Sequence, residues 1–296
     1  TTLFRSLVEA PTAPSSGFPG SRFVNVGEIS ARGMELGVNG RVVESDDFAW
    51  SLNGSVSTNH TEITDLGDFT SLGAGTLQLH REGYPVAAYF MRRVVSAELD
   101  DAGQVVSAQC RASDERDGST VPCDEAPQVF SGVPFPTVTS SLQSTMTLFD
   151  RLRVSGMVEL RSGHRKILGD ISGAHHVFRN TRAINTNEFP VLEAYDQVSG
   201  FDFFHSGLAD AGFLKLRNVS VNYELPEPLA ARIGFSRASV TLSGQNLAML
   251  WQEQEELFGR QIIDPENRLT SSETSGYVQT TLPHMTSLSA RLNLSF

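Results

Sequence analysis

The last eleven residues constrain the fold of this chain more than any other stretch. From Leu288 to Phe296 every even position is apolar, whereas the odd positions carry Ser, Arg or Asn. Successive side chains of a β-strand point to opposite faces, so this pattern predicts a strand with one apolar and one polar face. Eleven residues is also about the length that a tilted strand needs to cross a bilayer. Taken alone, the segment fits a sandwich strand and a membrane-barrel strand equally well.

Composition narrows the choice of class. The chain has 296 residues, of which 40% are hydrophobic and 19% charged, and no run approaches the length of an apolar helix that could cross a membrane. A mean hydropathy of -0.16 suits a barrel whose strands alternate lipid-facing and water-facing residues, and it suits a secreted β-sandwich as well. The net charge of -11 argues against a nucleic-acid partner, because such binding depends on clusters of Lys and Arg.

The same alternation recurs along the chain. We expect eight strands, at residues 1–8, 29–43, 48–57, 138–148, 152–160, 213–225, 238–246 and 286–296. The phase of the alternation slips near Asn218, which indicates a β-bulge. The faces opposite the apolar ones carry mostly Ser, Thr, Asn and Gln, which suits a wall around a wide wet lumen or a plug.

The lengths of the expected connections separate a barrel from a sandwich. Short turns are predicted at 44–47, 150–151 and 226–235, and long segments at 9–28, 61–137, 164–212 and 248–284. If the strands alternate in direction, all long segments leave at one end and all short turns at the other. Transmembrane barrels have this arrangement, with long extracellular loops. The sequence therefore predicts an all-β fold, an antiparallel transmembrane β-barrel portion of about eight strands.

The two cysteines, Cys110 and Cys123, are separated by twelve residues rich in Asp, Ser, Gly and Pro. In an oxidising compartment they would form a disulfide worth roughly 3 kcal/mol on the chain-entropy model. The alternative is two unpaired thiols. A zinc site is disfavoured, because the chain has only two cysteines and no His lies between or beside them.

Several blocks stand out along the chain: residues 25–36, Asp47-Phe-Ala-Trp50, Gly83-Tyr-Pro85, Gly132-Val-Pro-Phe-Pro136, 210–226, 240–247 and Asp264-Pro-Glu266. Together they resemble one family, the SusC/RagA-type TonB-dependent outer-membrane transporters. The resemblance implies that residues 1–296 are the C-terminal portion of a barrel of about 22 strands. It also implies that the plug, the TonB box and the earlier strands are absent from this sequence.

The resemblance further implies a location and partners. The location is the bacterial outer membrane, with its lipid around the barrel. A SusD-like lipoprotein would be a partner, and TonB would act through the missing N-terminal part. An aromatic last residue on an alternating strand also resembles the sorting signal of outer-membrane barrels, here Leu292, Leu294 and Phe296.

Candidate site residues are few. His164, His175, His176 and His205 share one predicted loop, but their spacing matches no metal motif and no catalytic triad. We therefore expect no catalytic residue, no metal and no cofactor. Trp251, which enters a long loop, has two interpretations: an aromatic of the membrane-interface belt, which we favour, or a platform for a sugar or peptide. His175 and His176 are the other possible ligand contacts.

The function we expect is that of barrel wall and ligand-facing loops in an importer of oligosaccharides or oligopeptides, without covalent chemistry. A secreted β-sandwich that binds glycans is the main alternative. An outer-membrane barrel enzyme is a third.

Overall fold

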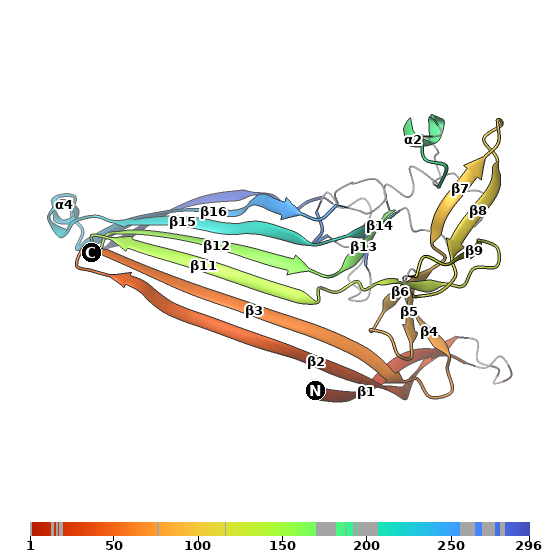
Figure 1. Ribbon diagram of the computed structural model, residues 1–296. Coiled ribbons are helices and arrows are strands. Elements are labelled where there is room, and N and C mark those ends of the chain that lie inside the picture. The colour runs from red at the N-terminus through yellow and green to blue at the C-terminus, as the bar shows by residue number, and fades with distance from the viewer. Residues whose placement is uncertain are drawn as a thin grey trace.

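The computed structural model describes residues 2–12, 15, 17, 20–75, 77–115, 117–169, 182–186, 188–191, 194, 207–254, 264–267, 276–278 and 282–296. It contains one long sheet and, at one end of it, a layer of smaller sheets (Figure 1). We call these the wall sheet and the loop layer.

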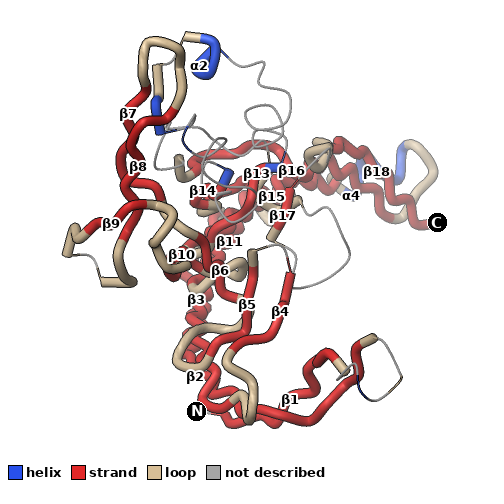
Figure 2. Tube along the Cα trace, turned by 90° about the vertical axis from the view of Figure 1, so that its right-hand side faces the viewer, coloured by secondary structure: helices blue, strands red, loops and turns tan. Residues whose placement is uncertain are grey.

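The wall sheet contains eight antiparallel strands that pair in chain order. They are β1 (Thr2–Pro11), β2 (Ser21–Glu44), β3 (Phe48–Asp65), β11 (Val138–Leu148), β12 (Leu152–Ser162), β15 (Phe213–Glu224), β16 (Arg237–Gln252) and β18 (Ser287–Ser295). Among the described residues β1 and β18 each pair with one strand, so the sheet is open. Seen along its strands, it curves as an open arc (Figure 2). The eight predicted strands are confirmed.

Connection length also divides the two ends of the wall sheet as predicted. The turns β2–β3 and β11–β12, and the turn with helix α4 (Glu227–Arg232), lie at one end, which we call the turn end (Figure 1). The segments 66–137 and 163–212 leave at the opposite end. The expected long loop at 9–28 was wrong, because Pro11 pairs with Ser21. Gly20 and Gly27, which look like turn residues in the sequence, adopt positive φ at the start of β2 and within it.

Among the described residues, one face of the wall sheet is apolar and exposed. The register aligns apolar or glycine residues of neighbouring strands in rows, one of which contains Val38, Gly54, Leu142, Val158, Leu216 and Ala248. Val38 is 61% exposed and Leu142 is 46% exposed. In a sandwich this face would be buried against a second sheet. The exposed row therefore excludes the sandwich alternative.

The loop layer contains three small sheets and a helix. The first sheet is β10 (Val129–Gly132), β6 (Ala88–Met91), β5 (Gln78–Arg81) and β4 (Ser71–Gly75); the second is β14 (Leu208–Asp210), β13 (Arg165–Leu168) and β17 (Tyr277–Val278); the third is β7 (Val94–Leu99), β8 (Val105–Arg111) and β9 (Thr120–Pro122). Helix α2 spans Arg182–Asn185. No helix among the described residues has the length and apolarity that crossing a membrane requires.

The buried core of the chain lies mainly in the loop layer. Tyr89, Met91 and Ile167 are fully buried and pack in one cluster with Leu208. The predicted long segments 61–137 and 164–212 contain short strands where they are described. Strand β6 is buried at all four positions, so it lacks the alternation that marks the wall strands.

Candidate functional site

The polar face of the wall sheet is lined by hydroxyl groups that pair across strands. Three such pairs join directly opposed serines: Ser55 with Ser141 (2.8 Å), Ser155 with Ser220 (2.8 Å) and Ser243 with Ser289 (2.7 Å). Asn222 donates to Thr241 in the same way, at 2.7 Å. A hydroxyl keeps further lone pairs available after one such bond. This face is therefore suited to contact with water or with a polar solute.

Toward the loop layer the polar face becomes charged. Six side chains form this region, which we call the charged rim: Glu159 and Arg161 on β12, Lys215 and Arg217 on β15, and Asp264 and Glu266 from the segment between β16 and β18. All except Arg161 have side chains at most 16% exposed. Three cations thus meet three carboxylates in a partly buried place, and the formal charges cancel.

The predicted bulge near Asn218 places Arg217 in the rim. Met157 pairs with Asn218 and Val158 with Leu216, so Arg217 is an extra residue on β15. Arg217 donates to Glu159 Oε2 through Nε at 2.5 Å and to Glu266 through both terminal nitrogens, at 2.6 and 2.5 Å. Such forked contacts between guanidinium and carboxylate are the strongest and most directional ion pairs in proteins. The bulge therefore joins β12, β15 and the 264–267 segment.

Glu266 is the centre of the rim. Lys215 Nζ donates to its Oε2 at 2.8 Å, beside the two bonds from Arg217. Burial by itself would raise the pKa of Glu266, but the hydrogen bonds from Arg217 and Lys215 outweigh it and lower the pKa to about 2. Glu266 is therefore a carboxylate at any physiological pH.

The residues 264–267 form a turn that is fixed to the wall. Asp264 accepts a hydrogen bond from the amide of Glu266 and another from the amide of His284, both at 3.1 Å. Lys166, at the start of the loop layer, donates to the carbonyl of Asn267 at 2.8 Å. The charged rim therefore holds this turn against the polar face.

His164 is a buried group with an unsatisfied atom. The side chain follows β12 and is 4% exposed, and its Nδ1 has no hydrogen-bond partner. Burial, together with the nearby Lys166 and Arg161, lowers its pKa to about 4, so the imidazole is neutral at neutral pH.

The predicted disulfide is confirmed. Cys110 and Cys123 are bonded, and both are buried beside Val94 and Ala126. The bond joins the end of β8 to the residue after β9. It therefore staples the third sheet of the loop layer and lies away from the charged rim.

The remaining predicted site residues fall in different places. Trp251 is opposite Leu214, a residue of the apolar face, and is 45% exposed. His175 and His176 lie outside the described residues. Leu292, Leu294 and Phe296 are exposed on β18 and the terminus after it, and the Phe296 ring lies 5.0 Å from that of Phe235. Sorting and ligand contact remain predictions for these residues.

The charged rim was missed in the sequence. Its signals are present there, in the Asp264-Pro-Glu266 block and in the phase slip near Asn218. What the sequence lacked was the contact between the two, because Arg217 and Glu266 are 49 residues apart.

The arrangement defines a class. An open arc of antiparallel strands, with an exposed apolar face, a hydroxylated polar face and all long loops at one end, is part of the wall of a transmembrane β-barrel.

Comparison with known proteins makes the class more specific. No protein-family model matches the chain. It is 26% identical over 321 residues to TonB-dependent receptor P26 of Formosa agariphila, a match that covers 98% of this chain and 31% of that receptor. It is 31% identical over 87 residues to TonB-dependent receptor SusC of Bacteroides thetaiotaomicron, covering 25% of this chain. The chain thus spans about a third of the length of the P26 relative.

Solved structures agree on the fold. The RagAB peptide transporter matches with a TM-score of 0.74 and 20% identity, over 98% of this chain and 32% of that one. The RagAB peptide importer in its open-open state matches with a TM-score of 0.73. The predicted similarity to SusC/RagA-type TonB-dependent transporters is thereby confirmed. Together with the exposed apolar face, it assigns this chain to the bacterial outer membrane.

Proposed function

We propose that this chain is the C-terminal portion of the barrel of a TonB-dependent nutrient importer, where it forms wall and ligand-facing external loops. The observation that carries the proposal is the turn 264–267, which the charged rim ties to the polar face. A wall that holds an external loop over a hydroxylated interior is what a gated import channel requires. The likeness to TonB-dependent receptors supports the same assignment.

In this proposal the polar face contacts water, the solute or a plug, and the loop layer presents the recognition surface. The charged rim has no net charge, so it positions a loop rather than attracting ions of one sign. Trp251 belongs to the membrane-interface belt. Gating belongs to the plug, the TonB box and the earlier strands, which lie outside this chain, and TonB supplies the work.

The proposed cargo is an oligopeptide or an oligosaccharide. The similarity to the RagAB peptide transporter over nearly the whole chain favours an oligopeptide. The match to SusC covers a quarter of the chain. The cargo crosses without covalent change, so the importer is not an enzyme.

We also propose a SusD-like lipoprotein as the partner that covers the loop layer. Affinity purification of the full-length protein from detergent-extracted outer membranes tests this. A lipoprotein in a fixed ratio to the barrel is expected. A barrel that purifies alone at every detergent concentration contradicts the pairing but leaves the import proposal intact.

Uptake by cells is the direct test of import. A strain that lacks the full-length gene is complemented with wild type or Glu266→Ala and given labelled oligopeptides or oligosaccharides. Wild type should restore uptake of one class, an uncoupler of the proton-motive force should abolish it, and the cargo should be recovered intact. Glu266→Ala should lower uptake at least about tenfold, since the tethered turn is released.

Glu44→Ala is the matched control. Glu44 is also an ion-paired glutamate, but it pairs with Arg41 in an exposed position at the turn end. It should transport like wild type. Uptake that is independent of the gene, or unaffected by the uncoupler, contradicts the proposal.

A further inference from the structure

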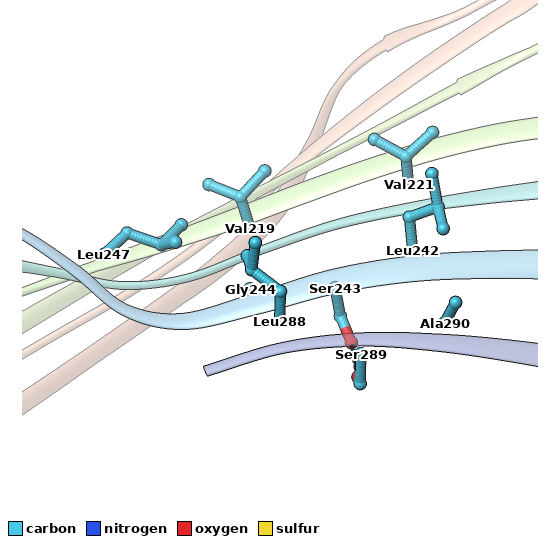
Figure 3. Close-up of a pocket in the computed structure, with 9 residues that line it drawn as sticks. All are labelled: Val219, Val221, Leu242, Ser243, Gly244, Leu247, Leu288, Ser289 and Ala290. Carbon is cyan, nitrogen blue, oxygen red and sulfur yellow. Dashed lines mark hydrogen bonds between the residues drawn. The ribbon is translucent and has the colours of Figure 1, made fainter. Parts of the chain in front are cut away.

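The apolar face of the wall sheet contains a groove at β15, β16 and β18. It has a volume of about 510 Å³ and lies open to the outside. Val219, Val221, Leu242, Leu247 and Leu288 form its walls and Gly244 its floor, and Figure 3 shows these side chains on one side of the strands. The volume falls within the range of small-ligand sites, roughly 300–1,000 Å³.

The groove follows from the register and from small residues. Gly244 pairs with Val219 on one side and Leu288 on the other, so a row with no central side chain crosses three strands. In the next row the small Ala290 is opposite Leu242. The groove therefore has a low floor between raised walls.

Leu247 closes the groove toward the loop layer. Its preceding residue, Asn246, adopts φ +52°, and the register of β16 shifts there. A Cβ on Gly244 would lie 2.6 Å from Leu247 Cδ2 and 3.1 Å from Leu288 Cδ2. The leucines thus lean over the position that glycine leaves empty.

The lining is chemically simple. Its only polar side chains, Ser243 and Ser289, point to the opposite face, where their hydroxyls bond each other at 2.7 Å (Figure 3). No lining residue carries a charge. A sugar or a peptide would therefore leave its polar groups unsatisfied in this groove, whereas a hydrocarbon chain would not.

The groove lies at the depth of the hydrocarbon layer. Trp251 and Leu250, both about half exposed, lie beyond it toward the loop layer, and Phe296 lies beyond it toward the turn end. On the β12 side the groove is continuous with the exposed apolar face, so membrane lipid is in direct reach of it.

We propose that this groove is a specific binding site for one acyl chain of a membrane lipid. A chain that lies in the groove contacts side chains of β15, β16 and β18 together, whereas one on the flat part of the apolar face gains contacts on one side only. The site thus retains a single lipid when the surrounding lipids exchange. This goes beyond import, because the groove faces away from the polar passage.

Native mass spectrometry of the full-length protein tests the proposal. The protein is stripped of lipid by detergent, titrated with palmitoyl-oleoyl-phosphatidylethanolamine, and weighed as wild type, Ala290→Phe and Val38→Phe. Ala290 is exposed at the groove edge, so a phenyl ring there fills the groove without displacing core atoms. Val38 is an exposed residue of the same face on β2, away from the groove.

Wild type and Val38→Phe should each retain one lipid with at least about tenfold higher affinity than further lipids. Ala290→Phe should retain one lipid fewer, while its heat-modifiable migration and its uptake of cargo match wild type. Equal lipid retention in all three proteins overturns the proposal, as does equal loss in both variants. A mass that shows a second copy of the barrel at the groove in place of lipid also overturns it. Since uptake is measured separately, failure here does not touch the proposed import.

Discussion

The wall sheet and the loop layer are stabilised in opposite ways. In the loop layer, Tyr89, Phe90 and Met91 are buried and a disulfide closes the third sheet, as in a small water-soluble domain. In the wall sheet many apolar residues, such as Val38 and Leu142, are exposed, and the strands are joined by backbone pairing and by hydroxyl ladders. The two regions differ in this way because they are surrounded by different media. On one face of the wall, membrane lipid takes the place of a packed protein core.

The charged rim is where the two regions meet, and breaking it should have the largest effect. Glu266→Ala leaves Lys215 and Arg217 without their main acceptor in a partly buried place. We expect a loss of roughly 3–4 kcal/mol, at the lower end for broken buried pairs because Arg217 keeps Glu159. Urea unfolding of the full-length barrel measures it. A loss below about 1 kcal/mol would show that the rim is effectively solvated.

Glu266 should also make the stability of the folded protein depend on pH, with a sign that follows from its lowered pKa. The pKa of Glu266 falls from an ordinary value of 4.5 to about 2, so its ion pairs stabilise the folded state fully above about pH 4.5. That contribution should be lost as the pH falls from about 4.5 toward 2. Comparing unfolding of wild type and Glu266→Gln across this window checks it, because the variant should lack this component. Identical pH profiles would contradict the assignment.

The disulfide should matter to the loop layer alone. Replacing both Cys110 and Cys123 with Ser removes about 3 kcal/mol from the local stability of β7–β9. Hydrogen exchange of the β7 and β8 amides should accelerate by roughly 100-fold, while amides of β11 and β12 are unchanged. Faster exchange in the wall strands would mean that the two regions unfold together.

Two neighbouring residues of β11, Leu142 and Gln143, lie on opposite faces of the wall sheet, so substituting each of them tests the assignment of the faces. Leu142→Arg places a charge on the apolar face and should cost about 2 kcal/mol, a value that side-chain snorkelling keeps modest. Gln143→Arg, one residue further on the polar face, should cost close to nothing. Unfolding of both variants in the same lipid vesicles makes the comparison. Equal costs would contradict the assignment of the faces.

The smallest effect is expected at the β11–β12 turn. Phe149 and Asp150 adopt φ of +53° and +55°, and the amide of Arg151 donates to the carbonyl of Leu148 at 3.0 Å. Such turns favour glycine or asparagine. Asp150→Gly should therefore stabilise the barrel by roughly 1 kcal/mol, as judged by its urea midpoint. A lowered midpoint would show that Asp150 has another role.

The wall could be predicted from the sequence because its physics is local. A period of two marks each strand, and the phase slip near Asn218 marks the bulge at Arg217. The turn at Asp150 was recognised as well, one residue out of place, since its centre is Phe149 and Asp150.

The loop layer and the charged rim could not be predicted, because they depend on distant partners. The side chain of Gln78 accepts from the amide of Gly276, and Lys166 donates to Asn267. A strand buried on both faces, such as β6, has no alternation to detect. Such contacts depend on how the chain folds in three dimensions. The pattern of neighbouring residues in the sequence does not contain this information.

The extra residue in β15 decides which face of the sheet the first residues of this strand occupy. Counting back by twos from Val221 and Val219, strict alternation would direct Arg217, Lys215 and Phe213 into the acyl chains and Leu214 and Leu216 into the channel. The extra residue reverses these orientations. It therefore keeps Lys215 and Arg217 out of the hydrocarbon layer. Deleting Arg217 would remove the bulge and its guanidinium but leave these faces unchanged, because Leu216 would then alternate regularly with Asn218.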